Sequence, residues 1–156
     1  MKNIQIAYLA GIIDGEGTVN ITYVAKRDSY RLRIQVVNTD KRLIDWLHEN
    51  FHSHIYEVKR HSLQNPKWRK RYEWFLFPKR DTLPLLKSLI PFLICKKEQM
   101  KIAVSFIETT GKMGKRLSRD VYKARKEYKE RLNALNMRGA SEQRLSEKTA
   151  KADAIV

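Results

Sequence analysis

Hydrophobic and polar residues alternate along two early segments of the chain. Segments 18–24 (TVNITYV) and 30–37 (YRLRIQVV) change between polar and apolar at every second residue. This period is typical of β-strands with one buried face. Residues 26–29 (KRDS) predict the turn between them. The sequence therefore predicts a hairpin with one apolar side and one side rich in basic and amide groups.

A second strand pair and several helices follow. Residues 55–60 and 72–77 predict strands that flank a basic loop. Apolar residues at helical spacing predict helices over 3–13, about 41–51 and 83–90, with Asp40 as an N-cap and Pro91 as a stop. Two later helices are expected over 96–109 and 119–136.

The order of these elements repeats a strand–strand–helix unit. The sequence α-ββ-α-ββ-α predicts an α+β fold, in which a saddle-shaped four-stranded antiparallel sheet carries helices on one face and leaves the other face bare. The chain has 156 residues, a length that suits one domain. We assign that domain to residues 1–138 and a polar C-terminal tail to 139–156.

The charge of the chain indicates its partner. Lys and Arg number 32 against 17 Asp and Glu, which gives a net charge of +15. Such an excess favours a polyanion as the partner, and we expect nucleic acid. The hydrophobic fraction of 42% excludes a disordered basic tail.

Cysteine content and hydropathy restrict the setting. The single Cys95 excludes a disulfide framework within the chain and a Cys-based zinc site. The apolar run 4–13 is far shorter than the roughly 20 residues of a membrane span. We therefore expect no membrane partner, and a location in the cytosol or an organelle interior.

One short motif carries the most specific signal. Residues 9–17 (LAGIIDGEG) resemble the LAGLIDADG motif of a family of homing endonucleases, in the leading Leu-Ala-Gly, both acidic positions and the final Gly. The order of elements and the length resemble the single-motif, homodimeric branch of that family. The resemblance implies an intron-encoded, site-specific DNA endonuclease that cuts both strands and leaves 3′ overhangs. It also implies that Glu16 is the catalytic acid, where the family's eponymous motif has Asp.

Small side chains near this motif predict a dimer. Ala7, Ala10, Gly11 and Asp14 fall on one helical face at spacings of three and four residues, which would let the same helix of a second chain approach closely. Paired Glu16 carboxylates beside DNA phosphates require a hard divalent cation, and we expect Mg²⁺, whose place Mn²⁺ or Ca²⁺ would also take. The resemblance implies the Gly15 carbonyl as a further ligand. The alternative is a helix end followed by a solvent-exposed acid.

Three further residues resemble the polar shell that supports catalysis in the family. They are Lys96, Asn38 and Arg42. The alternative for Lys96 and Arg42 is an ordinary cation at a helix start, and for Asn38 it is turn formation.

The polar side of the sheet predicts DNA contacts in the major groove. From the first hairpin we predict Asn20, Thr22, Lys26, Arg31, Arg33 and Gln35. From the second hairpin we predict Tyr56, Lys59, Arg60, Glu73 and Phe75. Phosphate contacts are predicted for Lys67, Arg69, Lys70, Arg71, Lys112, Lys115, Arg116 and Arg119.

Two other functions share these features. An RNA-binding intron maturase has the same basic surface, and a non-cleaving DNA-binding protein would not need the acid at position 16. The spacings of His48, His52, His54 and His61 match no standard zinc site. A dimer that follows about one helical turn of DNA per protomer predicts a pseudo-palindromic target of about 20 base pairs.

Overall fold

A computed structural model describes residues 3–51, 53–58, 70–109 and 118–153, with side chains as far as residue 137. The elements are α1 (Asn3–Glu16), β1 (Gly17–Val24), the 3₁₀ helix η1 (Ala25–Arg27), β2 (Ser29–Asn38), α2 (Lys41–Phe51), β3 (His54–Glu57), β4 (Tyr72–Leu76), η2 (Arg80–Thr82), α4 (Leu83–Leu89), η3 (Ile90–Phe92), α5 (Lys97–Glu108) and α6 (Arg119–Asp153). The predicted α-ββ-α-ββ-α order is confirmed.

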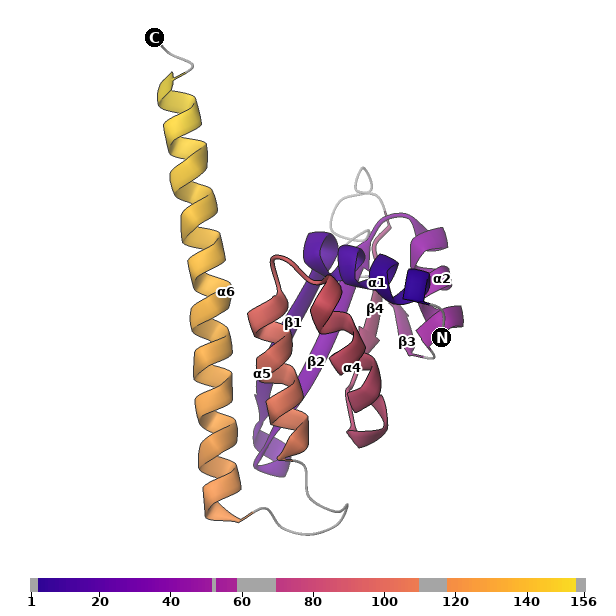
Figure 1. Ribbon diagram of the computed structural model, residues 1–156, viewed down its shortest axis with the longest axis vertical. Coiled ribbons are helices and arrows are strands. Elements are labelled where there is room, and N and C mark those ends of the chain that lie inside the picture. The colour runs from indigo at the N-terminus through magenta and orange to yellow at the C-terminus, as the bar shows by residue number, and fades with distance from the viewer. Residues whose placement is uncertain (1–2, 52, 59–69, 110–117, 154–156) are drawn as a thin grey trace.

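The four strands form one antiparallel sheet in the order β1-β2-β4-β3. Helices α1, α4 and α5 lie over the same side of this sheet (Figure 1). The strands therefore bury their apolar side under the helices, as the alternating pattern predicts. Ile34 and Trp74, on the two central strands, are 1% and 0% exposed. The predicted α+β fold with helices on one face is confirmed.

Helix α1 is longer than predicted and runs directly into β1. Gly15 and Glu16 are helical, and none of Gly11, Gly15 and Gly17 has a left-handed backbone conformation. Gly17 is required for a different reason. A Cβ atom on Gly17 would lie 2.6 Å from both the Cα and the carbonyl oxygen of Ile13, so only glycine lets the strand leave the helix so closely.

We expect Gly17→Ala to lower the free energy of unfolding by about 1–3 kcal/mol, because the added methyl group meets backbone that cannot move aside cheaply. Urea unfolding followed by circular dichroism measures the change. The control is Thr18→Ala at the next, exposed position, where little loss is expected. Equal stability of the two variants would contradict this account of Gly17.

Helix α6 covers the outer edge of the sheet. The Asn136 side-chain amide donates a hydrogen bond to the Val19 carbonyl on β1 at 3.2 Å. The Tyr122 hydroxyl donates to Asp28 in the β1–β2 turn at 3.2 Å. Leu132 is fully buried between these anchors. An edge strand covered in this way is protected from pairing with other chains.

Two boundaries differ from the sequence prediction. Helix α6 continues to Asp153 rather than ending near 136, and Figure 1 shows its last part extending beyond the rest of the domain. Residues 137–153 contain no proline, and most of them are good helix formers. Strand β3 spans His54–Glu57 and begins one residue before the predicted 55–60, of which residues 59 and 60 lie outside the described residues. Within the described part of the chain, no helix has the length and apolar character needed to cross a bilayer.

Candidate active site and nucleic-acid interface

One side of the sheet carries no helix from the described part of the chain and presents polar and aromatic side chains. This open face consists of Thr18, Asn20, Thr22, Arg31, Arg33, Gln35, Val37, His54, Tyr56, Glu73 and Phe75, which alternate with the core residues of their strands. The ten of these side chains besides Val37 are polar or aromatic. The open face therefore holds the donors, acceptors and rings that could contact a nucleic acid.

The register brings the predicted contact residues together in rows. Asn20 lies opposite Arg33, and Thr22 lies opposite Arg31. Gln35 lies opposite Thr18 on β1 and also opposite Phe75 on β4, so one row crosses the middle of the sheet. An Arg beside an Asn or a Gln is the pairing that recognises purine edges in the major groove.

The second hairpin also turns the predicted side chains outward. Trp74 and Leu76 are buried, which places Glu73 and Phe75 on the open face. Tyr56, opposite Glu73, is 57% exposed. His54 and Phe77 were not predicted as contact residues, and the centroids of their rings lie 5.9 Å apart. No local pattern identifies them, since the sheet order brings them together.

Several of the predicted DNA contacts, from the second hairpin and from the phosphate-binding set, lie outside the described residues. These are Lys59, Arg60, Lys67, Arg69, Lys112, Lys115 and Arg116. Lys26, Lys70 and Arg119 are exposed. Lys70 pairs with Glu57 at 3.5 Å, and Arg71 pairs with Glu73 at 3.4 Å.

The motif helix α1 ends beside the loop that leads into α5. The Asp14 carboxylate accepts hydrogen bonds from the backbone N–H groups of Ile94, at 2.6 Å, and Lys96, at 2.8 Å. The Lys96 ammonium donates to the Asp14 carbonyl at 2.6 Å. Asp14 therefore holds the loop 94–96 against the end of α1 by hydrogen bonds. Lys96 places a positive charge at this C-terminal end of the helix, where the helix dipole is negative.

Glu16 is the last residue of α1 and is exposed. Among the described residues, its carboxylate has no hydrogen-bond or ion-pair partner. The Gly15 carbonyl belongs to the last turn of the helix, where carbonyl groups lack partners within the helix. Two hard oxygen ligands are therefore available side by side at this helix end.

The exposed side of α1 differs from the predicted one. Ala10 is 0% exposed, so it belongs to the core and its prediction as a dimer contact is wrong. The Asp14 carboxylate is bonded within the chain, and its role as a dimer contact stays a prediction. Four exposed residues of α1 follow one another at spacings of three and four, and we call them the α1 strip: Ile4, Tyr8, Gly11 and Gly15. Ala7 is half-buried beside it.

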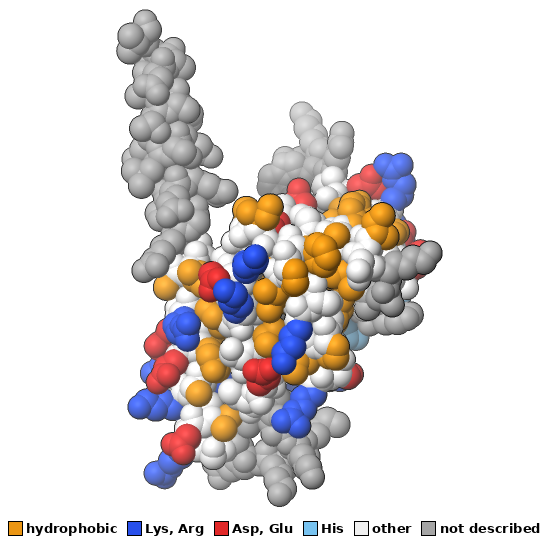
Figure 2. Space-filling view, viewed as in Figure 1, with side chains coloured by type: hydrophobic (Ala, Val, Ile, Leu, Met, Phe, Trp, Pro, Cys, Tyr) orange, Lys and Arg blue, Asp and Glu red, His pale blue; other side chains and the backbone are white. Residues whose placement is uncertain are grey.

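The α1 strip is apolar and has room above its glycines. Ile4 and Tyr8 are 75% and 53% exposed, and a Cβ atom on Gly11 or Gly15 would meet nothing within 4 Å. Figure 2 shows hydrophobic side chains gathered over the region of α1, whereas basic and acidic groups are interspersed elsewhere on this face. Within the described chain, nothing requires positions 11 and 15 to be glycine.

Comparison with known proteins identifies the fold. No family model and no curated protein matches the sequence. Among solved structures, the archaeal intron-encoded homing endonuclease I-Vdi141I, complexed with DNA, matches with 14% identity over 86% of this chain and 86% of that one, at a TM-score of 0.70. The homing endonuclease I-CvuI, in complex with its target in the presence of calcium, matches with 16% identity over 85% and 82%, at 0.68. The chain has the LAGLIDADG homing endonuclease fold.

This chain also matches part of a longer protein with the same fold. The LAGLIDADG meganuclease I-AabMI, bound to uncleaved DNA, matches with 16% identity over 80% of this chain but only 43% of its own, at a TM-score of 0.58. This chain therefore corresponds to less than half of that protein. The likeness to I-Vdi141I and I-CvuI extends over most of both chains.

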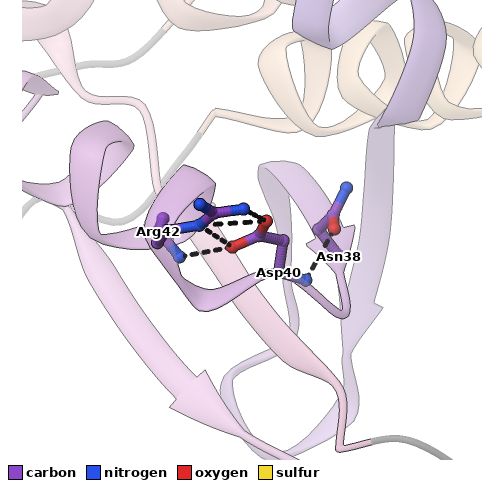
Figure 3. A network of polar contacts seen from close by, with 3 residues as sticks. All are labelled: Asn38, Asp40 and Arg42. Carbon is purple, nitrogen blue, oxygen red and sulfur yellow. Dashed lines mark hydrogen bonds and ion pairs between the residues drawn. The ribbon is translucent and has the colours of Figure 1, made fainter.

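Asn38, Asp40 and Arg42 form a polar network in the LAGLIDADG-fold chain (Figure 3). The Asn38 side-chain oxygen accepts the Asp40 N–H at 2.8 Å. Asp40 accepts the backbone N–H of Arg42 at 2.9 Å, which confirms it as the N-cap of α2, and the Arg42 guanidinium at 2.6 Å. The contacts of Asn38 and Arg42 are therefore those of a turn and a helix start. A catalytic role for either residue stays a prediction.

The register places this network near the motif helix. Gly17, the residue after Glu16, lies opposite Val36, two residues before Asn38. The end of β2, the end of α1 and Lys96 therefore meet at one end of the sheet. Among the described residues, no group of three or more His, Cys, Asp or Glu side chains is positioned to hold a metal ion.

We expect Asp40→Asn to reduce stability fully above about pH 4 and progressively less as the pH falls towards about 2. The Arg42 guanidinium lowers the pKa of Asp40 to about 2, below its ordinary unfolded value of about 3.9. The contribution is therefore present above the unfolded pKa and is lost as the pH falls through the folded pKa. Asn keeps the cap but not the charge pair. Thermal unfolding of both proteins from pH 7 to pH 2 should show a difference that disappears at the acid end.

Two results would contradict this assignment. One is a constant difference between wild type and Asp40→Asn over the whole range. The other is a full pH-dependent difference in the Arg42→Met background, where the guanidinium that lowers the pKa is missing.

Proposed function

We propose that this protein is a site-specific double-strand DNA endonuclease that acts as a homodimer with divalent metal and leaves 3′ overhangs. The observation that carries the proposal is the exposed, unpaired Glu16 carboxylate at the end of α1, in a chain with the LAGLIDADG homing endonuclease fold. A carboxylate without a partner beside a basic open face is unfavourable for DNA binding unless a cation lies between the acid and the phosphate.

The open face binds the DNA duplex in this proposal. A net charge of +15 favours phosphate contacts and makes binding strongly salt-dependent. The rows formed by Asn20 with Arg33 and by Thr22 with Arg31 are suited to base edges in the major groove. One protomer follows about one turn of DNA, so the dimer occupies about 20 base pairs with approximate twofold symmetry.

The α1 strip is the dimer interface in this proposal. Exposed Ile4 and Tyr8 supply apolar area, and the unfilled space above Gly11 and Gly15 lets a second helix approach. A twofold axis there brings both α1 ends together, because an isologous contact uses the same residues from each chain. The partial coverage of I-AabMI supports this arrangement, since two copies would provide a comparable length.

The residues at the helix end fit a hard divalent cation. The Glu16 carboxylate and the Gly15 carbonyl of two protomers would hold Mg²⁺, which supplies charge neutralisation at the scissile phosphate and a more acidic water. The structures of I-CvuI in complex with DNA were determined in the presence of calcium or magnesium. In this chain, Asp14 fixes the loop 94–96, and Lys96 therefore stays at the same helix end as Glu16.

The proposal is tested with the pure protein and a plasmid library of randomised sites. We expect discrete double-strand cuts in Mg²⁺ and none in EDTA. Sedimentation should give about 37 kDa, twice the chain mass of 18.5 kDa. Failure to cut any site in Mg²⁺, or a strict monomer on DNA, contradicts the proposal.

A further inference from the structure

The β3–β4 half of the open face differs chemically from the β1–β2 half. Three rings, those of His54, Phe75 and Phe77, form what we call the aromatic cluster. The His54 and Phe75 rings stack at 5.9 Å, and Phe75 contacts Phe77 edge-on at 5.3 Å. Phe75 and Phe77 are half-buried and His54 is exposed. Apolar area left uncovered in this way typically marks a binding surface.

The aromatic cluster is continuous with the hydrogen-bonding half of the open face. Phe75 lies opposite Gln35 on one side and His54 on the other. The Arg31 guanidinium lies 5.2 Å from the centre of the Phe77 ring. A duplex that lies on Arg31, Arg33 and Gln35 would therefore also meet these rings.

The major groove offers one apolar group to such rings. Base edges there present hydrogen-bond donors and acceptors, except for the 5-methyl group of thymine. Aromatic side chains match that methyl group and leave the polar edges of other bases unpaired. We infer that the aromatic cluster recognises thymine methyl groups, so each half of the target carries thymines under β4; this inference rests on the proposed function.

The separation of Phe75 and Phe77 along the chain also predicts the spacing of the thymine methyl groups in the target. Phe75 and Phe77 are two residues apart, which is about 6.8 Å along an extended chain. That distance corresponds to about two base pairs at a rise of about 3.4 Å. Each half-site should therefore contain two methyl contacts separated by about two base pairs, on either strand.

Stacking on unpaired bases is the alternative use of aromatic rings on a sheet. The contacts within the aromatic cluster favour the duplex. The His54 and Phe75 rings already stack on one another at an interplanar angle of 29°, and the Arg31 guanidinium lies over the Phe77 ring. The ring edges that remain free suit a small methyl group better than a base plane.

The test removes single methyl groups from the DNA. Duplexes bound by the full chain are first selected from a random library. Each thymine of the selected site is then replaced by deoxyuridine, and the Kd is measured by fluorescence anisotropy. We expect about fourfold weaker binding at two positions per half-site, the factor that follows from burying one methyl group, and a change within experimental error at the other thymines.

Protein variants then assign the effect. Phe75→Ala should lose the deoxyuridine penalty at one of the two positions, and Phe75→Leu should keep part of it because Leu retains apolar bulk. The control is Arg33→Ala, which should weaken binding overall and keep both penalties. Circular dichroism verifies that each variant is folded, and the wild-type measurement tests the inference without any variant.

The contrary results separate the two proposals. A duplex that is bound and cut in Mg²⁺ without any deoxyuridine penalty overturns the methyl inference alone, as does a penalty unchanged in both Phe75→Ala and Phe77→Ala. Loss of single-strand binding but not duplex binding in Phe75→Ala assigns the rings to unpaired bases and also overturns it. Enrichment of no duplex at all overturns both proposals.

Discussion

Replacing Glu16 by Gln is expected to reduce DNA cleavage at least about a hundredfold while leaving DNA binding intact. The carboxylate is exposed and has no partner among the described residues, so its loss should not disturb the fold. Gln keeps the shape of the side chain but removes the charge that holds a hard cation. Loss of electrostatic stabilisation at a reacting phosphate has effects of this size.

Binding and cleavage respond in opposite directions in this prediction. In EDTA, Glu16→Gln should bind its duplex as tightly as wild type or more tightly, because one repulsion with phosphate is removed. In Mg²⁺, its single-turnover cleavage rate should fall. The matched control is Glu108→Gln, which makes the same chemical change on α5, where Glu108 pairs with Lys87 at 2.8 Å. Full cleavage by Glu16→Gln would exclude the proposed metal site.

Replacing Gly11 by Gln is expected to convert the proposed dimer into monomers and to abolish double-strand cleavage. In the chain itself a side chain at position 11 meets nothing within 4 Å, and Gln is a better helix former than Gly. The fold should therefore be unchanged or more stable. A second helix, however, would no longer be able to approach closely at this point of the α1 strip.

Sedimentation velocity and circular dichroism measure these two outcomes separately. We expect the apparent mass to fall from about 37 kDa towards the 18.5 kDa of one chain, with an unchanged helical signal. The control is Ala134→Gln, which adds similar bulk on the exposed side of α6 and should remain dimeric. A Gly11→Gln protein that sediments and cleaves like wild type would place the dimer contact elsewhere.

The alternation of residues in the strands predicted the two faces of the sheet correctly. Side chains in a strand change sides at each residue, so a one-residue slip would bury Arg31 and Arg33 and expose Leu32 and Ile34. The same reasoning placed Glu73 and Phe75 opposite buried Trp74. The N-cap role of Asp40 was also predicted, because capping depends on residues adjacent in the chain.

The place of Ala10 on the exposed side of α1 was predicted wrongly, and the reason is the composition of the helix. Both sides of α1 carry apolar residues, since Ile4 and Tyr8 are exposed whereas Ile6 and Leu9 are buried. A helix that is apolar all round has no pattern that shows which side faces the core. The sequence therefore indicated close helix packing near Gly11 but assigned it to the side that contains Ala10.

The sequence by itself determined the order of elements, the two faces of the sheet, the positive charge and the acidic helix end, because these depend on periodicity and composition over short stretches. Only the tertiary structure decided that Asp14 binds a loop 80 residues away. It also decided, through the pairing of β2 with β4, that Gln35 lies beside Phe75. Contacts between distant segments depend on sheet order and core packing, and no local pattern encodes either.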